Sequence, residues 1–298
     1  MRGILIPIFY LVFQFIIVFN ALEPFCMVVV DEVGRSVSIP DTPKRIVSLA
    51  PSITEILYEI GLEDSIVGVT EYSNYPPRVS TLPKIGTYVN INLERVLELQ
   101  PDLAIGTADG NVKSDVERLN TFGVPIYTTY SKNIQGVMQS IAKIGEITGK
   151  KKEAEDLVRD MKGEMSRIRA KSAGSYRPRV VILYSISPII TAGSGTFADD
   201  LIRIAGGKNI SGDSETKYPR YSLESIIVKN PEIIIVTVMG EDKREKRGTP
   251  EFPHIWDNVQ AVREKKVYSI DPDIINRPSP RIIMGLKEMV RIFEDVAR

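Results

Sequence analysis

The chain has 298 residues, which is long enough for two domains that each bury a core. Its 38 Lys and Arg residues balance its 38 Asp and Glu residues, so a nucleic-acid partner, which requires a basic excess, is not expected. One cysteine excludes an intrachain disulfide, and with one histidine it leaves no His/Cys cluster for zinc or an iron–sulfur centre.

Residues 1–26 are predicted to be a signal peptide or a membrane anchor. A basic start at Arg2 is followed by an apolar run over 4–19, which is typical of an export signal. The run is shorter than most membrane-spanning helices. Cys26 stands where the modified cysteine of a lipoprotein would stand, although Glu23-Pro24-Phe25 is a poor motif for lipidation. In either case the mature protein is expected outside the cytoplasmic membrane, in the periplasm or on the cell surface.

Residues 27–149 are predicted to form a first α/β lobe. A hairpin over 27–39 leads to a core strand at 47–49. The pattern Ser52-Ile53-Thr54-Glu55 is that of a capping box and is expected to begin the first helix. Strands and helices then alternate as far as a helix at 133–148, which is typical of a sheet covered by helices.

Residues 150–173 are predicted to form one long helix. Its apolar residues recur at steps of three or four and are Ala154, Leu157, Val158, Met161, Met165 and Ile168. They form one narrow stripe on an otherwise charged helix about 33 Å long. Such a helix suits a strut lying across two domains, and a surface helix of a single domain is the alternative.

Residues 174–298 repeat the order of the first lobe. The stretch 45–52 is answered by 179–186, and 92–105 is answered by 222–235. Both halves therefore have the order strand, helix, short strand, helix, strand. The sequence predicts two similar three-layer α/β lobes joined by one long α-helix.

No pattern in the chain indicates an enzyme. Cys26 lies in the export region, and His254 lies in an apolar setting before a helix, which favours a structural role. The stretch 193–195 is not a nucleophile elbow, and 145–151 lacks the spacing of a phosphate-binding loop. A two-lobed enzyme that acts on a metal-bound substrate through His254 remains as the less favoured alternative.

Aromatic and charged residues gather in loops beyond the ends of the predicted strands. Tyr72 and Tyr88 belong to the first lobe, and Tyr184, Tyr218 and Arg277 belong to the second. In open α/β sheets ligands bind beyond the carboxyl ends of the strands. A cleft between domains that is lined by aromatic rings and a few charges is a common small-molecule site.

In these features the chain resembles the periplasmic substrate-binding proteins of ABC importers for iron–siderophores, haem and cobalamin, whose two lobes are joined by one long helix. The resemblance covers residues 28–298 and is closest to the cobalamin-binding branch. It rests on the order and spacing of six stretches, namely 45–55, 72–77, 92–95, 100–102, 206–207 and 277–281. It implies an exported protein, without catalysis or a cofactor of its own, that captures a metal chelate between its lobes and delivers it to an ABC permease dimer.

The resemblance also implies which residues contact the ligand. They are Tyr72, Tyr88, Tyr184, Tyr218, Asp273 and Arg277. Tyr88 and Tyr218 stand where the cobalamin branch has tryptophan, and Thr107 and Ile274 replace further aromatic residues. A corrinoid or another flat metal chelate fits this set, and an iron(III)–siderophore or haem is the alternative ligand.

Glu94 and Glu224 occupy equivalent places in the repeat, each after a leucine at the start of a helix. The resemblance implies that they dock onto arginines of the two permease subunits. Such charge pairs fix orientation more than affinity. The alternative is that each glutamate only stabilises the N-terminus of its own helix.

Overall fold

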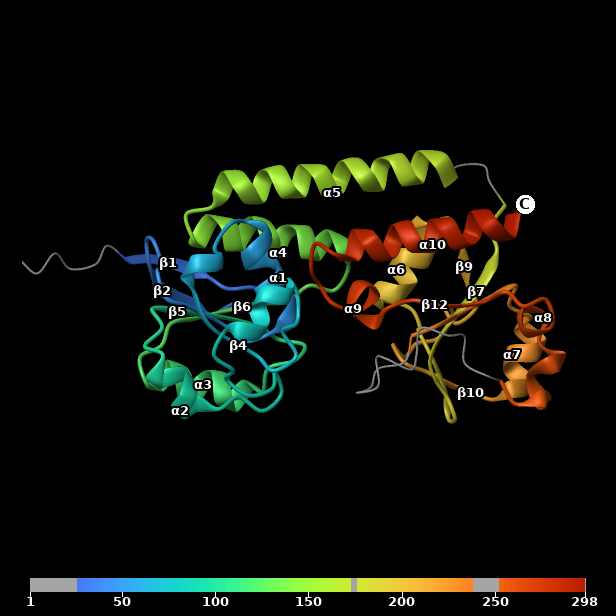
Figure 1. The fold of residues 1–298 in the computed structure, drawn as a ribbon, viewed down its shortest axis with the longest axis horizontal. Helices are drawn as coiled ribbons and strands as arrows, with labels where there is room; N and C mark the ends of the chain where they lie inside the picture. The colour runs from blue at the N-terminus through green and yellow to red at the C-terminus, as the bar shows by residue number, and fades with distance from the viewer. Residues whose placement is uncertain (1–25, 173–175, 238–251, 298) are drawn as a thin grey trace, which may run out of the picture.

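The computed structural model describes residues 26–172, 176–237 and 252–297. The predicted signal peptide or anchor therefore lies outside the described residues, apart from Cys26, which is exposed. The described chain forms two α/β lobes, and one long helix, α5, lies across both of them (Figure 1).

The first lobe is a parallel sheet with helices on both faces. The sheet has four strands in the order β4-β3-β5-β6, and an antiparallel hairpin, β1-β2, precedes it. The strands are β1 (Cys26–Val30), β2 (Ser36–Pro40), β3 (Ile46–Ser48), β4 (Ile66–Val69), β5 (Leu103–Thr107) and β6 (Ile126–Thr129). The helices are α1 (Pro51–Glu59), α2 (Leu93–Glu98), α3 (Lys113–Thr121) and α4 (Ile134–Ile147). Strand β5 is buried at every position because helices cover both faces of the sheet.

The second lobe has a mixed sheet of six strands in the order β10-β8-β7-β11-β12, with β9 beside β7. The strands are β7 (Arg179–Ile186), β8 (Ile189–Thr191), β9 (Lys208–Asn209), β10 (Arg220–Tyr221), β11 (Ile233–Val236) and β12 (Val267–Ser269). The helices are α6 (Phe197–Ile204), α7 (Leu223–Lys229), α8 (Gln260–Arg263), α9 (Pro272–Ile275) and α10 (Ile282–Ala297). The antiparallel strands β8 and β10 were not predicted. Ile189 and Thr191 are buried, and β8 pairs with β7 on one side and β10 on the other.

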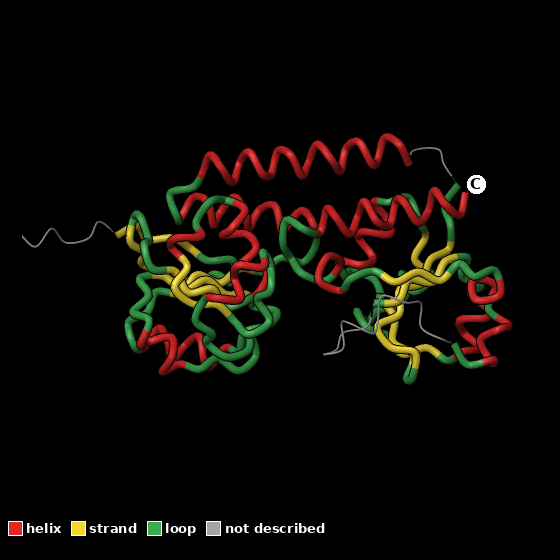
Figure 2. Tube along the Cα trace, in the orientation of Figure 1, coloured by secondary structure: helices red, strands yellow, loops and turns green. Residues whose placement is uncertain are grey.

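Helix α5 spans Lys151–Ser172 and has 22 residues. Its apolar stripe faces the lobes, with Ala154, Met161, Met165 and Ile168 buried. It packs along α4 of the first lobe and against α10 and α6 of the second. The tube in Figure 2 shows α5 continuing without interruption from one lobe to the other. The prediction of a single linking helix is confirmed.

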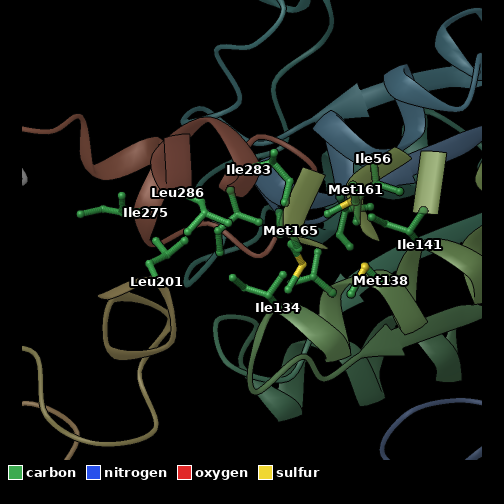
Figure 3. Packing of buried hydrophobic residues seen from close by; sticks show 14 of the residues in the cluster. Ile56, Ile134, Met138, Ile141, Met161, Met165, Leu201, Ile275, Ile283 and Leu286 are labelled. Carbon is green, nitrogen blue, oxygen red and sulfur yellow. The ribbon is translucent and has the colours of Figure 1, made fainter. Parts of the chain in front are cut away.

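One apolar cluster runs beneath α5 through both lobes. In Figure 3, Met165 of α5 lies between Ile134 of α4 and Ile283 of α10. Two further clusters are separate and lie on the other faces of the two sheets, one under α2 and α3 and one under α7 and α8. Each lobe therefore has three layers, and the layer beneath α5 is common to both.

The start of α1 differs from the prediction. The helix begins at Pro51, and its N-cap residue, Ala50, offers no side-chain hydrogen bond. Proline suits the first turn because the N–H it lacks has no partner there. The predicted capping box is therefore wrong, and the carboxylate of Glu55 is free for the lobe boundary, where its partners lie.

Candidate ligand-binding site between the lobes

Each lobe contributes one pair of tyrosine rings to the boundary between them. Tyr72 and Tyr88 of the first lobe meet edge to face, with ring centroids 6.4 Å apart. Tyr184 and Tyr218 of the second lobe do the same at 5.4 Å. This geometry is favourable for aromatic pairs. Tyr72, Tyr88 and Tyr218 are exposed by 53%, 37% and 59%, so their faces remain available to a ligand.

Each pair lies on its own lobe, and the charges of the first lobe influence Tyr218 of the second. Although Tyr218 is more than half exposed, desolvation of its phenol raises its pKa, and the charges of Asp109 and Tyr88 raise it further. Asp109 and Tyr88 belong to the first lobe, so Tyr218 of the second lobe lies opposite them. Burial, together with Tyr218, raises the pKa of Tyr184 strongly. We call these four predicted tyrosines, which form one pair on each lobe, the tyrosine cluster.

The loop after β5 places Tyr88. The amide Nδ2 of Asn111 donates to the carbonyl oxygens of Leu49 and Tyr88, both at 2.8 Å, and its Oδ1 accepts from the Thr107 N–H at 2.8 Å. Asn111 is buried, so these bonds are shielded from water. Gly110 lies directly under the ring, because a Cβ at this position would be 2.4 Å from Cδ2 of Tyr88.

A similar arrangement places Tyr218 in the second lobe. The Gly193 N–H donates to the Lys217 carbonyl at 2.8 Å, and the Thr191 N–H donates to the Pro219 carbonyl at 3.1 Å. A Cβ on Gly193 would be 2.2 Å from the Thr216 carbonyl oxygen. Each lobe therefore uses a glycine for the close approach that holds its exposed tyrosine.

Arg277 and Asp273 lie beside the tyrosines, but their charges are used within the protein. Nη1 of Arg277 lies 2.9 Å from Glu55 Oε1, and Nη2 lies 2.9 Å from Asp273 Oδ1. Arg277 also donates to Asn74 Oδ1 at 2.9 Å and to the Tyr72 carbonyl at 3.2 Å. Asp273 in turn accepts from Asn74 Nδ2 at 3.1 Å. These two residues join the lobes directly next to Tyr72.

Several residues of this region were not predicted. Asn276 accepts a hydrogen bond from the Tyr184 hydroxyl at 2.9 Å. The guanidinium carbon of Arg281 lies 4.1 Å from the ring centroid of Tyr75. Glu55, Asn74 and Asn111 complete the set. Asn74 and Arg281 lie within the stretches that carry the family resemblance, and Asn111 ends the polar loop after β5.

Two cavities open elsewhere along the lobe boundary, near α5. They have volumes of about 310 and 490 Å³ and share Asn133, Asp200 and Arg203. The larger one is also lined by Lys132 and Lys217. None of the six predicted ligand residues lines either cavity. Lys217, which lines the larger cavity, directly precedes Tyr218 in the chain.

Glu94 and Glu224 are exposed in the first turns of α2 and α7. Asn92 and Ser222 cap these two helices through their side chains. Backbone N–H groups, and then the Ser222 hydroxyl, lower the pKa of Glu224. The two helices belong to different lobes and lie on the side of the molecule away from α5 (Figure 1).

Comparison with known proteins shows the family to which the chain belongs. Residues 46–274 match the model of a family described as periplasmic binding protein. The chain belongs to the periplasmic binding protein family.

Other members of the periplasmic binding protein family are similar over most of their length. A vitamin B12-binding protein of Vibrio parahaemolyticus is 32% identical over 257 residues, which cover 86% of this chain and 91% of the relative. The uncharacterized ABC transporter substrate-binding lipoprotein YvrC of Bacillus subtilis is 34% identical over 276 residues, covering 90% and 85%. The crystal structure of the periplasmic vitamin B12 binding protein BtuF of Vibrio cholerae has a TM-score of 0.74 at 29% identity, covering 85% of this chain and 98% of that chain.

These relatives are substrate-binding proteins and not enzymes, as the sequence predicted. The surroundings of His254 differ from the prediction, because its side chain is exposed and lies 3.5 Å from Asp257. The neighbouring Trp256 is buried instead and packs on Phe252 with ring centroids 4.8 Å apart. Within the described residues, no helix of this periplasmic binding protein combines the length and apolar character that crossing a bilayer requires.

Proposed function

We propose that this protein captures a corrinoid between its lobes and delivers it to an ABC importer. The observation that carries the proposal is that each lobe holds one edge-to-face pair of tyrosine rings beside the lobe boundary. Aromatic rings present large apolar faces that suit a broad, flat chelate. In this proposal Tyr72, Tyr88, Tyr184 and Tyr218 pack on the corrinoid, while Asp273 and Arg277 border it at the Tyr72 end. The vitamin B12-binding relatives support this choice.

The charges and pKa values of the site favour a neutral corrinoid over the alternatives. Arg277 is already paired with Glu55 and Asp273, so it is poorly suited to compensate an anionic siderophore. Haem iron takes His, Cys, Met or Tyr as its axial ligand, and tyrosine binds ferric iron as the phenolate. Burial raises the pKa of Tyr184, and its hydroxyl already donates to Asn276, so this ring is engaged within the protein.

An anionic ferric chelate is the second candidate. The larger cavity gathers Lys132, Arg203 and Lys217, the last of which directly precedes Tyr218. Because Arg203 is ion-paired with Asp200, Lys132 and Lys217 are the cations of this cavity best suited to an anionic ligand. A siderophore with carboxylate or hydroxamate groups would extend from the rings into this cavity.

Equilibrium dialysis of the purified protein against cyanocobalamin, a ferric hydroxamate and haemin tests the proposal, because each ligand absorbs visible light. We expect cyanocobalamin to be retained with a Kd of about 1 µM or below, equivalent to about −8 kcal/mol. Retention of the ferric hydroxamate alone would favour the second candidate. Retention of none of the three would contradict capture of a metal chelate.

Delivery is proposed to use Glu94 and Glu224 as one anchor on each lobe. A permease made of two equivalent subunits needs one matched charge per lobe, and the duplicated lobes provide it. The name of the Bacillus subtilis relative, which is an ABC transporter substrate-binding lipoprotein, supports this partner. We also propose that residues 1–26 export the chain, with lobes at 27–149 and 174–298 and the linking helix at 150–173 between them.

Substitution of Gly110 by alanine is expected to weaken corrinoid binding about tenfold, equivalent to about 1.4 kcal/mol. The new Cβ would lie 2.4 and 2.7 Å from two ring carbons of Tyr88, so the ring must leave its position. Equilibrium dialysis measures the effect. Gly163→Ala on α5 is the matched control, because its Cβ would meet only a distant atom of Arg167 at 3.9 Å. Equal affinities of the two variants would show that Tyr88 need not hold this position.

A further inference from the structure

A buried glutamate of the first lobe makes all its side-chain bonds to the second lobe. Glu55 on α1 is 1% exposed. Its Oε1 accepts from Nη1 of Arg277 at 2.9 Å and from Nη1 of Arg281 at 3.0 Å. Its Oε2 accepts from the Ser279 hydroxyl at 2.5 Å. Since these three partners precede α10 in the second lobe, the carboxylate acts between the lobes.

The same two arginines hold the loop that carries Tyr72. Arg277 donates to the Tyr72 carbonyl and to the side chain of Asn74, both in the first lobe. Arg281 lies over the ring of Tyr75 in the same loop. The position of Tyr72 therefore depends on two arginines of the opposite lobe, and Glu55 fixes both guanidinium groups.

The network is balanced in charge and hard to open. Glu55 and Asp273 are the anions, and Arg277 and Arg281 are the cations. The side chains of the two arginines are only 15% and 12% exposed. Separating these groups would leave buried charges without partners, which is among the most destabilising changes a protein can undergo.

A second bridge between the lobes is simpler. Oδ2 of Asp200 on α6 accepts from the backbone N–H of Ile134 on α4 at 3.1 Å. Asp200 is also ion-paired with Arg203 within its own lobe, and both residues line the two cavities. Ile134 also belongs to the apolar layer beneath α5, so the lobes stay in contact on this side when the latch is absent.

We infer that Glu55 is a latch that keeps the lobes together beside Tyr72 and positions this tyrosine through Arg277. Without the latch the lobes separate on the Tyr72 side and stay joined beneath α5, where Asp200 meets Ile134. Arg277 is accordingly a positioning residue rather than a group that neutralises the ligand. The effect on binding rests on the proposed function, whereas the latch itself can be measured without a ligand.

Distance measurement between two spin labels tests the latch. The labels are placed at the exposed residues Asn90 of the first lobe and Glu215 of the second, in a chain in which Cys26 is replaced by serine. We expect Glu55→Gln to lengthen and broaden the distance distribution by several ångström. Glu59→Gln changes an exposed glutamate at the end of the same helix, α1, and outside the network; it is the matched control and should leave the distribution unchanged.

A double variant keeps the test decisive if the single variant unfolds. Glu55→Gln with Arg281→Gln removes one charge of each sign and also breaks the latch, so its distance distribution should be broad while its stability partly recovers. Corrinoid affinity of a folded latch variant should fall severalfold, because the Tyr72 loop is no longer held. An unchanged distance distribution in a folded latch variant would overturn the inference, whether or not the protein binds a corrinoid.

Discussion

Replacing both Tyr88 and Tyr218 by alanine is expected to abolish corrinoid capture at micromolar concentrations while both lobes stay folded. The two rings come from different lobes, and both are exposed, so neither is needed for the core. Burial of one aromatic face against a ligand contributes about 2 kcal/mol. The loss of both rings amounts to about 4 kcal/mol, which is roughly a 1,000-fold rise in Kd.

Equilibrium dialysis against cyanocobalamin measures this loss, and the thermal unfolding midpoint checks the fold. Tyr176→Ala is a suitable control because Tyr176 is also exposed but bonds to Glu232 outside the site. Phenylalanine at positions 88 and 218 should retain most of the affinity, since the rings are expected to act through their faces. If the double alanine variant binds within threefold of the unaltered protein, the tyrosine cluster is not the ligand site.

Reversing both docking charges, Glu94→Lys together with Glu224→Lys, is expected to reduce corrinoid uptake at least tenfold without changing corrinoid affinity. Each lysine would meet a permease arginine with like charge, and repulsion of this kind costs several kcal/mol at an interface. A lysine at a helix N-terminus costs only about 0.3–1 kcal/mol at an exposed site, so the fold should survive. Uptake is measured in native host cells that carry the variant in place of the natural chain.

Glu117→Lys with Glu264→Lys is the charge-matched control, because it reverses one exposed acid on each lobe away from the starts of α2 and α7. This control should leave uptake intact. If both double variants lower uptake equally, overall charge and not a specific pair of anchors governs delivery. If neither double variant lowers uptake, Glu94 and Glu224 only stabilise the N-termini of their own helices. The lowered pKa of Glu224, which backbone N–H groups cause, agrees with that role.

Local sequence patterns predicted the parts of this protein that local forces determine. The apolar stripe of α5 follows from a helical period, and it lies against the lobes as expected because no other face of that helix can be buried. Tyr72 follows the end of β4 as expected, whereas Tyr184 lies within β7. The stripe of α5 depends on residues three or four positions apart, and the tyrosine positions were taken from short sequence motifs in a fixed order along the chain.

The parts that were missed depend on partners far apart in the chain. Glu55 was interpreted as a capping residue because Ser52 stands three residues before it, yet its partner Arg277 lies 222 residues away. No local period reveals such a pair. The same is true of the contacts of Arg277 with Glu55 and Asn74, which were not predicted, whereas its place beside the ligand stays a prediction. Strand β8 was missed because its antiparallel place in the sheet depends on β7 and β10 on either side.

The apolar layer beneath α5 has a consequence for how the two halves of this duplicated chain can change. In a tandem pair joined only by a tether, each copy is free to accumulate mutations independently. Here α4 and α10 lie against the same helix, so a bulkier side chain at Met165 would press on both copies together. The two halves are therefore expected to evolve together along this layer. Either half expressed alone would expose an apolar helical surface to solvent.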